Sequence, residues 1–417
     1  MISTANDLAL QRLKNASPRF VDVKQAKDLL PDFDKYTILH AGPPIKYLDM
    51  CAPMQEAVHA ALIYEDLAVD REDAKLLASS SKIKYSPCHS KGVVGPMTGV
   101  TSWSMPLLVV ENTDYGNYAY STINEGAGDV IRFGACTDNT IKRLKWIENT
   151  LAPCLKKVVD SYGGIDLTGI IAQAVTMGDE LHMRNNASSR VFVYEIVSRL
   201  AQVNESEEFL EVIEFLTSRN DQFFLNFAMA ANKSAADAAS NIPGSSIVTA
   251  IARNGVEVGI KVSGLKDEWF TAPAPAVDGL YFSGFDENDS NPDLGDSAIM
   301  EVNGFGAFAM AAGPAIVQIL GIENTSKAFE LTEEMTKITH GEHFKYSVST
   351  TNFSGLPLGI DVMKVIESNI TPAITTAIAG KEPGVGMIGA GLSRVPYLVF
   401  DKAIRRFDEV VQELYEK

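Results

Sequence analysis

Cysteine is scarce in this sequence of 417 residues. The four cysteines are Cys51, Cys88, Cys136 and Cys154, and no two of them form a CxxC pair. Such sparse cysteines exclude a disulfide scaffold, and their spacing does not suggest a zinc site. We therefore expect reduced thiols in a cytoplasmic protein.

Several catalytic motifs are also missing. The sequence has no GxxxxGK[ST] segment, so a P-loop nucleotide site is not indicated. It has no GxSxG elbow, and Cys88 and His89 are merely neighbours in the chain, which does not indicate a nucleophilic dyad. A covalent mechanism on serine or cysteine is therefore not predicted.

Basic residues are few, with 36 Lys and Arg against 53 Asp and Glu and a formal net charge of −17. This balance argues against nucleic acid or an anionic membrane as the main partner. The acidity is concentrated, because residues 201–300 hold 16 acidic and 5 basic residues, whereas residues 1–60 hold seven of each. We interpret segment 201–300 as a solvated or partner-facing surface, which leaves basic residues elsewhere free to form a local anion site.

No long hydrophobic run is free of interruptions. Residues 302–322 carry no charge, but Gly304, Gly306, Gly313 and Pro314 break the segment. We predict two short buried helical pieces separated at Gly313-Pro314 rather than a membrane span. The N-terminus lacks the apolar core of a signal peptide, so the protein is expected to be soluble and cytoplasmic.

The first third of the chain alternates between element types. Residues 5–30 are predicted to be helical, and residues 36–40, 82–86 and 107–111 to be strands, with helices over 53–79 between the first two strands. This order is typical of an α/β arrangement. A hairpin is predicted at residues 112–117, which are rich in turn formers.

The remaining two thirds divide at about residue 244. Helical patterns dominate residues 138–240, and two strands joined by Asn254-Gly255 follow over residues 246–263. A short strand is predicted at 280–283, and beyond Asp296 the pattern is read as helical. These features predict a multi-domain α+β (mixed α/β) protein, with an α/β domain at 1–137, a helical domain at 138–243 and a mixed α+β domain at 244–417.

The densest polar run is TMGDELHMRN at residues 176–185. If it is helical, Asp179, His182 and Asn186 share one face, and a carboxylate beside an imidazole suits acid–base chemistry or metal binding. The same residues could instead form a purely structural hydrogen-bond network. A metal site is not complete with only two ligands. The candidate catalytic residues are His182, Asp179, Glu180 and His89.

Glycine-rich turns follow several predicted strands. Gly42 lies after one strand, and Gly95 and Thr98 lie after the next, where backbone N–H groups could cradle a phosphate or carboxylate or could simply form tight turns. Glu125 and Arg132 flank further glycines and could bind a polar substrate or hold the turn together as an ion pair.

Three further segments add candidate binding residues. Asp293, Asp296 and Ser297 lie in NPDLGDS, which fits either a cation loop or a helix cap, and Lys381 follows an Ala/Thr-rich segment read as a helix. The full set of candidate substrate-binding residues is Arg184, Asn185, Arg253, Lys381, Gly42, Gly95, Thr98, Glu125, Arg132, Asp293, Asp296 and Ser297. No cofactor is expected, and a divalent metal is possible but not indicated.

Blocks of residues along the whole chain, from about 5 to 415, resemble the AllG/YlbE-like family. The blocks are HAGPP (40–44), PCH with VGPMTGVTS (87–102), NEGAG (124–128), RFGA (132–135), GIDLT (164–168), TMGDELHMRN (176–185), DQFFLN (221–226), SIVTAIARNG (246–255), FTAP (270–273), NPDLGDSAI (291–299), and ITP with GKEPGVGMIGAG (370–391).

The resemblance implies a subunit of oxamate carbamoyltransferase in allantoin breakdown. With AllF (FdrA-like) and AllH-like subunits, such a complex phosphorolyses oxalurate to oxamate and carbamoyl phosphate, so the expected ligand is a small anion and the expected state is oligomeric. The sequence lacks the Ser-Thr-Arg-Thr and His-Pro-x-Gln motifs of aspartate and ornithine transcarbamylases. A non-catalytic assembly or regulatory subunit, or a transferase or ligase acting on another small amide or carboxylate, are the alternatives.

Overall fold

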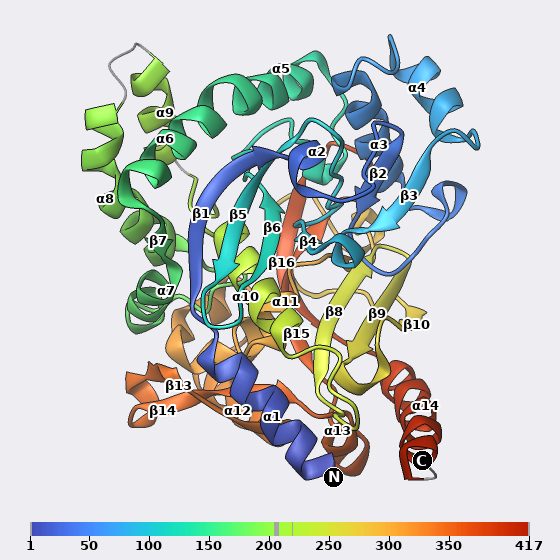
Figure 1. The fold of residues 1–417 in the computed structure, drawn as a ribbon, viewed down its shortest axis with the longest axis vertical. Helices are drawn as coiled ribbons and strands as arrows, with labels where there is room; N and C mark the ends of the chain where they lie inside the picture. The colour runs from blue at the N-terminus through green and yellow to red at the C-terminus, as the bar shows by residue number, and fades with distance from the viewer. Residues whose placement is uncertain (1, 204–207, 219, 416–417) are drawn as a thin grey trace.

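A computed structural model describes residues 2–203, 208–218 and 220–415. At its centre lies a curved five-stranded sheet in the order β4-β6-β5-β1-β7 (Figure 1). Strand β1 pairs antiparallel with β5 and β7, β5 pairs antiparallel with β6, and the short β4 pairs parallel with β6. The bounds are β1 Pro18–Gln25, β4 Val93–Val94, β5 Pro106–Asn112, β6 Asn117–Thr122 and β7 Ile165–Asp166.

Four smaller sheets surround this one. They are β10-β9-β8-β12, β11-β16-β15, the antiparallel pair β13-β14 and the parallel pair β2-β3. Their bounds are β2 Thr37–His40, β3 Lys84–Pro87, β8 Val248–Asn254, β9 Glu257–Val262, β10 Phe270–Pro273, β11 Asp278–Tyr281, β12 Leu294–Gly295, β13 Thr339–Val348, β14 Ser354–Ile360, β15 Ala373–Ala379 and β16 Met387–Arg394.

Most helices lie around these sheets, whereas α10 is buried at the centre and packs against β5 and β6 (Figure 1). Their bounds are α1 Ile2–Asn15, α2 Ala26–Leu29, α3 Ala52–Tyr64, α4 Arg71–Ala78, α5 Asp138–Trp146, α6 Ala152–Tyr162, α7 Leu167–Thr176, α8 Asn186–Val203, α9 Glu208–Thr217, α10 Leu225–Ala238, α11 Ile299–Val302, α12 Ser326–Thr336, α13 Val362–Ser368 and α14 Tyr397–Tyr415. The α+β class is confirmed.

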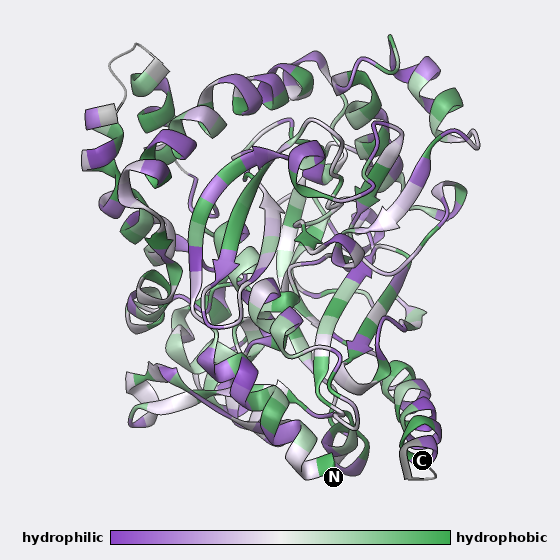
Figure 2. Ribbon diagram, in the orientation of Figure 1, coloured by the Kyte–Doolittle hydropathy of each residue, from purple (hydrophilic) through white to green (hydrophobic). Residues whose placement is uncertain are grey.

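The main hydrophobic core spans the three predicted segments. It includes Phe20 of β1, Phe227 of α10 and Phe400 of α14, all fully buried. The rings of Phe20 and Phe227 meet edge to face with centroids 5.0 Å apart, which joins the central sheet to the helical block. Figure 2 shows green residues along the central strands, whereas outer helices alternate purple and green, as expected for helices with one solvated face. The division at residues 137 and 243 stays a prediction.

Local signals predicted several turns and breaks correctly. The side-chain oxygen of Asn254 accepts the N–H groups of Val256 and Glu257, and Gly255 has φ +78°, which forms the predicted β8–β9 hairpin. The predicted hairpin at 112–117 joins β5 to β6. Segment 302–322 contains two short 3₁₀ pieces, residues 306–312 and 314–318, separated at Gly313. Among the described residues, no helix is long and apolar enough to cross a membrane.

Two predictions of secondary structure were wrong. The helix expected over residues 5–30 ends at Asn15, and Pro18–Gln25 forms β1, with Pro18 and Phe20 buried at alternate positions. Beyond Asp296 the helices α11 to α14 form as expected, but the four strands β13 to β16 lie among them, and the segment read as an Ala/Thr-rich helix is β15. Strand β15 is buried at six of its seven residues, so its β-branched side chains follow no two-residue alternation that could have marked it as a strand.

Candidate functional site

A cavity of about 480 Å³ lies where segments from all parts of the chain meet. Two glycine-rich turns, the N-terminal end of α10 and the loop before α8 supply most of its wall. It is lined by Pro96, Met97, Asn124, Gly126, Ala127, Gly128, Asp129, Val130, Arg132, Phe133, His182, Met183, Asn220, Asp221, Gln222, Leu225, Ser297, Thr376, Ala377, Gly384, Val385, Gly386 and Met387.

His182 and Glu301 form a buried pair at this cavity. The Nδ1 atom of His182 lies 2.8 Å and 2.9 Å from the two carboxylate oxygens of Glu301, and both side chains are almost completely buried. A carboxylate at Nδ1 holds the ring proton there and leaves Nε2 as the free nitrogen. His182 itself lines the cavity. The pair therefore presents one imidazole nitrogen for acid–base chemistry.

The loop that carries His182 is not helical, which corrects the predicted helix face. Helix α7 ends at Thr176 and α8 starts at Asn186, so Asp179, His182 and Asn186 do not share a face. The backbone turns at Gly178 and Leu181, whose φ angles are +97° and +67°. These left-handed conformations interrupt the helical path.

Asp179 and Glu180 stabilise this loop by accepting hydrogen bonds from nearby backbone N–H groups. A carboxylate oxygen of Asp179 accepts the N–H of Ser188 at 2.7 Å in the first turn of α8, as a helix cap does. Glu180 accepts the N–H groups of His182, at 3.2 Å, and of Arg184. Neither side chain lines the cavity. The carboxylate that contacts the His182 ring is thus Glu301, not Asp179 or Glu180 as predicted.

Thr375 connects the two buried glutamates. Its hydroxyl lies 3.0 Å from Glu180 and 3.4 Å from Oε1 of Glu301, and its N–H donates to the same Oε1 at 3.1 Å. Burial, together with the negative charge of Glu301, raises the pKa of Glu180 to about 7. A Cβ at Gly306 would lie 1.9 Å from Oε1 of Glu301, so this position requires glycine.

Asp296 joins the two glycine-rich loops that were expected to cradle an anion. It accepts the N–H of Gly42 at 2.8 Å and that of Gly95 at 3.2 Å. Complete burial raises the pKa of Asp296 to about 7. These N–H groups are occupied by a carboxylate of the chain itself, and neither glycine lines the cavity.

His89 lies near Asp296 but outside the cavity wall. Its Nε2 is 3.7 Å from Asp296, beyond hydrogen-bond distance, and its ring packs edge-on against Trp269. Burial, reinforced by the positive charges of Lys233 and Lys261, lowers the pKa of His89 well below its ordinary value. A buried neutral ring away from the cavity does not support the predicted catalytic role.

Arg253 and Asp293 form a second buried pair behind the cavity. The guanidinium contacts both carboxylate oxygens at 3.0 Å and 3.1 Å, and also donates to the Gly295 carbonyl. Burial alone would raise the pKa of Asp293, but Arg253 and the hydroxyl groups of Thr376 and Ser393 outweigh it and lower that pKa. The guanidinium of Arg253 also donates to the hydroxyl oxygen of Thr376, a wall residue, at 3.2 Å. Its donors are therefore occupied by groups of the protein itself.

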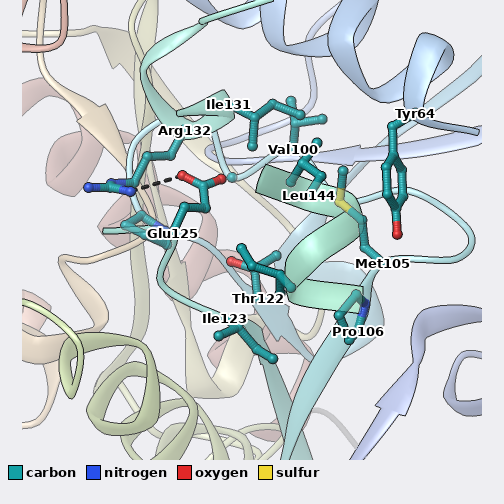
Figure 3. Close-up of a pocket in the computed structure, with 13 residues that line it drawn as sticks. Tyr64, Val100, Met105, Pro106, Thr122, Ile123, Glu125, Ile131, Arg132 and Leu144 are labelled. Carbon is teal, nitrogen blue, oxygen red and sulfur yellow. Dashed lines mark hydrogen bonds and ion pairs between the residues drawn. The ribbon is translucent and has the colours of Figure 1, made fainter. Parts of the chain in front are cut away.

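Glu125 and Arg132 form an ion pair, which was one of the two interpretations that the sequence allowed. Their side chains meet at 2.9 Å (Figure 3), and Arg132 also donates to the Gly126 carbonyl at 2.6 Å. Glu125 faces a separate small cavity of about 30 Å³, room for about one water molecule. Arg132 lines both cavities, so the pair holds the turn and also brings a cation to the larger cavity.

The other predicted residues contact the protein itself. Asn185 donates to the carbonyl of His182 at 2.9 Å, and Arg184 lies 3.5 Å from Asp179. The Thr98 hydroxyl donates to the carbonyl of Ile131 at 3.3 Å, and Lys381 is exposed and donates to the carbonyl of Asn288. Of the predicted site residues, the cavity wall therefore contains His182, Arg132 and Ser297.

Sequence reasoning missed Glu301, Thr375 and Thr376. Glu301 lies 119 positions from His182, and its only signal is a single carboxylate at the edge of the uncharged run. The letters of residues 384–389 also read GxGxxG. This segment is the turn from β15 into β16 rather than a strand-to-helix turn, so it is not a dinucleotide-binding fingerprint. The described residues contain no group of three or more His, Cys, Asp or Glu suited to a metal ion.

A model of the family described as oxamate carbamoyltransferase subunit AllG matches residues 83–297. The oxamate carbamoyltransferase subunit AllG of Escherichia coli (strain K12) is 41% identical over 98% of both chains. The chain belongs to the AllG family.

Two further relatives have no assigned activity. The uncharacterized protein YahG of Escherichia coli (strain K12) is 44% identical, over 97% of this chain and 85% of YahG. A crystal structure of a conserved protein of unknown function from Enterococcus faecalis V583 is 43% identical, covers 98% of both chains and superposes with a TM-score of 0.96. Two different proteins of Escherichia coli (strain K12) are thus similar to this chain over nearly its whole length.

Proposed function

We propose that this chain is a subunit of a carbamoyltransferase complex that converts oxalurate and phosphate to oxamate and carbamoyl phosphate. Membership of the AllG family supports the class of enzyme, and the His182–Glu301 pair at the cavity is the observation that carries a catalytic role. The complex would act in allantoin breakdown in the cytoplasm, with AllF (FdrA-like) and AllH-like subunits.

The reaction needs a proton donor at one nitrogen. A phosphate oxygen attacks the carbamoyl carbon, the bond from that carbon to the oxamate nitrogen breaks, and the nitrogen must gain a proton as it leaves. The attacking phosphate gives up a proton, so one group can accept that proton and deliver it to the nitrogen. Nε2 of His182 is suited to this transfer, because Glu301 fixes the ring at Nδ1.

Polar wall residues can orient the substrates around His182. The hydroxyl groups of Ser297 and Thr376 and the guanidinium of Arg132 line the same cavity. We assign Arg132 to an anionic group of oxalurate or phosphate and the two hydroxyls to hydrogen bonds with the carbamoyl group.

A second candidate is a non-catalytic assembly or regulatory subunit. The observation that favours it is the small positive charge of the wall, since Arg132 is the only lysine or arginine among its described residues and is already paired with Glu125. A third candidate is a transferase or ligase for another small amide or carboxylate. The 44% identity to YahG favours it, because a family with two proteins in one organism can serve two substrates.

The deciding experiment replaces His182 by Gln in the reconstituted three-subunit complex. Oxalurate phosphorolysis should fall about 10²–10⁴-fold, the usual contribution of a general acid–base group. His340→Gln is the matched control, because His340 also pairs with a carboxylate, that of Asp7, but lies outside the cavity wall. Full activity of the His182→Gln complex would refute the catalytic role.

Two further measurements separate the alternatives. Calorimetric binding of carbamoyl phosphate to the isolated chain supports the catalytic subunit, and lack of binding by a chain that still assembles supports the non-catalytic one. Turnover of other carbamoyl amides in preference to oxalurate supports the third candidate.

A further inference from the structure

A continuous exposed segment adjoins the cavity rim and has no role in the site described above. Residues 282–288 are all exposed, including Phe282 at 42% and Phe285 at 38%. Gly284 between them has φ +95° and open space around it. Two aromatic side chains in water within four positions are a feature of interaction surfaces. We name residues 282–289 the rim strip.

The rim strip is strongly acidic. Asp286 and Asp289 form a reciprocal capping box around a short turn, and Glu287 lies between them, exposed. Asp278, on the neighbouring strand β11, is exposed as well. Aromatic residues surrounded by carboxylates match a partner that presents apolar side chains together with Lys or Arg.

Backbone hydrogen bonds tie the rim strip to the wall of the cavity. The N–H of Phe282 donates to the Ile388 carbonyl at 2.7 Å, and the N–H of Lys381 donates to the Asp289 carbonyl at 2.8 Å. The segment between these two contacts contains Gly384, Val385, Gly386 and Met387, which line the cavity. A partner bound to the rim strip therefore lies beside this part of the cavity wall.

The described part of the cavity wall has little of the positive charge that its proposed substrates need. Among the residues that the structure describes, the wall contains Asp129 and Asp221 but one lysine or arginine, Arg132, whose guanidinium is held by Glu125. Phosphate and oxalurate are both anions, and transfer between them requires stabilisation of that charge. A cation supplied by another chain would add the positive charge that the described wall residues do not provide.

We propose that the rim strip is the docking surface for another subunit of the complex, which presents a segment rich in Lys or Arg and apolar residues and extends a cation toward the cavity. This inference rests on the proposed function for the identity of the partner. The binding itself is measured without substrate.

The test uses full-length chain mixed with each purified co-subunit, AllF-like and AllH-like. Phe282→Ser/Phe285→Ser should weaken binding to one co-subunit at least about tenfold. Asp278→Lys/Glu287→Lys, which leaves the capping box intact, should slow association and reduce its dependence on salt. Phe344→Ser on β13 and Glu367→Lys on α13 are the matched controls, because both residues are exposed outside the rim strip.

Hydrogen exchange gives a second readout that does not depend on the variants. Amides of residues 278–289 and 380–387 should gain protection in the complex. Unchanged affinity of both double variants, or protection confined to other segments, would overturn the proposal. It would also be overturned if the isolated chain is a dimer that Phe282→Ser/Phe285→Ser dissociates, because the strip would then serve a second copy.

The two proposals fail in different ways. A complex that assembles through the rim strip but leaves oxalurate intact refutes the proposed reaction and keeps the docking surface. A complex that phosphorolyses oxalurate with the rim strip unprotected refutes the docking surface alone.

Discussion

Glu301→Gln tests how the orientation of His182 is set. In the folded protein, Oε1 of Glu301 accepts N–H groups from Thr375 at 3.1 Å and Ala307 at 3.3 Å. A glutamine carbonyl must occupy this position, because an NH₂ group there would face two donors. The NH₂ group then takes the Oε2 position, 2.9 Å from Nδ1 of His182.

This exchange leaves the ring proton without a fixed position. Nδ1 then faces the glutamine carbonyl at 2.8 Å, which accepts a ring proton, and the NH₂ group at 2.9 Å, which donates and favours the tautomer with the proton on Nε2. The lost charge-assisted hydrogen bond is worth about 1.5–3 kcal/mol, or about 10- to 150-fold in rate. Where the ring takes the tautomer with its proton on Nε2, the total loss in rate reaches about 10⁴-fold. We expect kcat to fall between about 10²- and 10⁴-fold.

The assay measures oxalurate phosphorolysis by the reconstituted complex across pH 6–9. Asp361→Asn is the control, because Asp361 is a buried carboxylate 3.7 Å from a histidine, His340, that does not line the cavity. Its complex should keep nearly full activity. A Glu301→Gln complex that assembles and retains kcat within about threefold of the wild type would refute the reasoning.

Three further predictions follow from buried groups. Gly306→Ala places a Cβ 1.9 Å from Oε1 of Glu301 and should lower phosphorolysis about 10²-fold by displacing that carboxylate. The contribution of Asp296 to the free energy of unfolding should fall as pH rises from about 4 to about 7, because native Asp296 keeps its proton to about pH 7 whereas the unfolded side chain loses it near pH 4. The difference in the free energy of unfolding between wild type and Asp296→Asn, measured by urea titration, should therefore fall over the same pH range. Arg253→Met leaves Asp293 buried without its cation and should cost about 3–5 kcal/mol in urea unfolding.

Each of these three predictions would be contradicted by a specific result. A Gly306→Ala complex with normal kcat would show that the glutamate tolerates the added methyl group. Identical pH dependence of wild type and Asp296→Asn would mean that the native carboxylate is ionised at pH 5. A loss below about 1 kcal/mol in Arg253→Met would show that Asp293 is neutral or solvated after the substitution.

The sequence predicted much of the local structure because short-range chemistry decides it. Asn254-Gly255 specifies a hairpin through one side-chain acceptor and one positive φ, and both features act within three residues. The break at Gly313-Pro314 is equally local. The blocks that resemble the AllG family were also sufficient to identify it.

Tertiary structure decided the site and the elements around it. His182 meets Glu301 only because the loop before α8 packs against α11, and no spacing rule links positions 119 apart. Strand β15 is buried almost throughout by its neighbours, so its sequence lacks the alternation that marks a half-buried strand. Residue type alone suggested that an anion binds to Arg253 and to the N–H groups of Gly42 and Gly95. In the structure these groups already donate hydrogen bonds to buried carboxylates of the chain. Residue type sets what a group can bind, and long-range packing determines whether that capacity is still free.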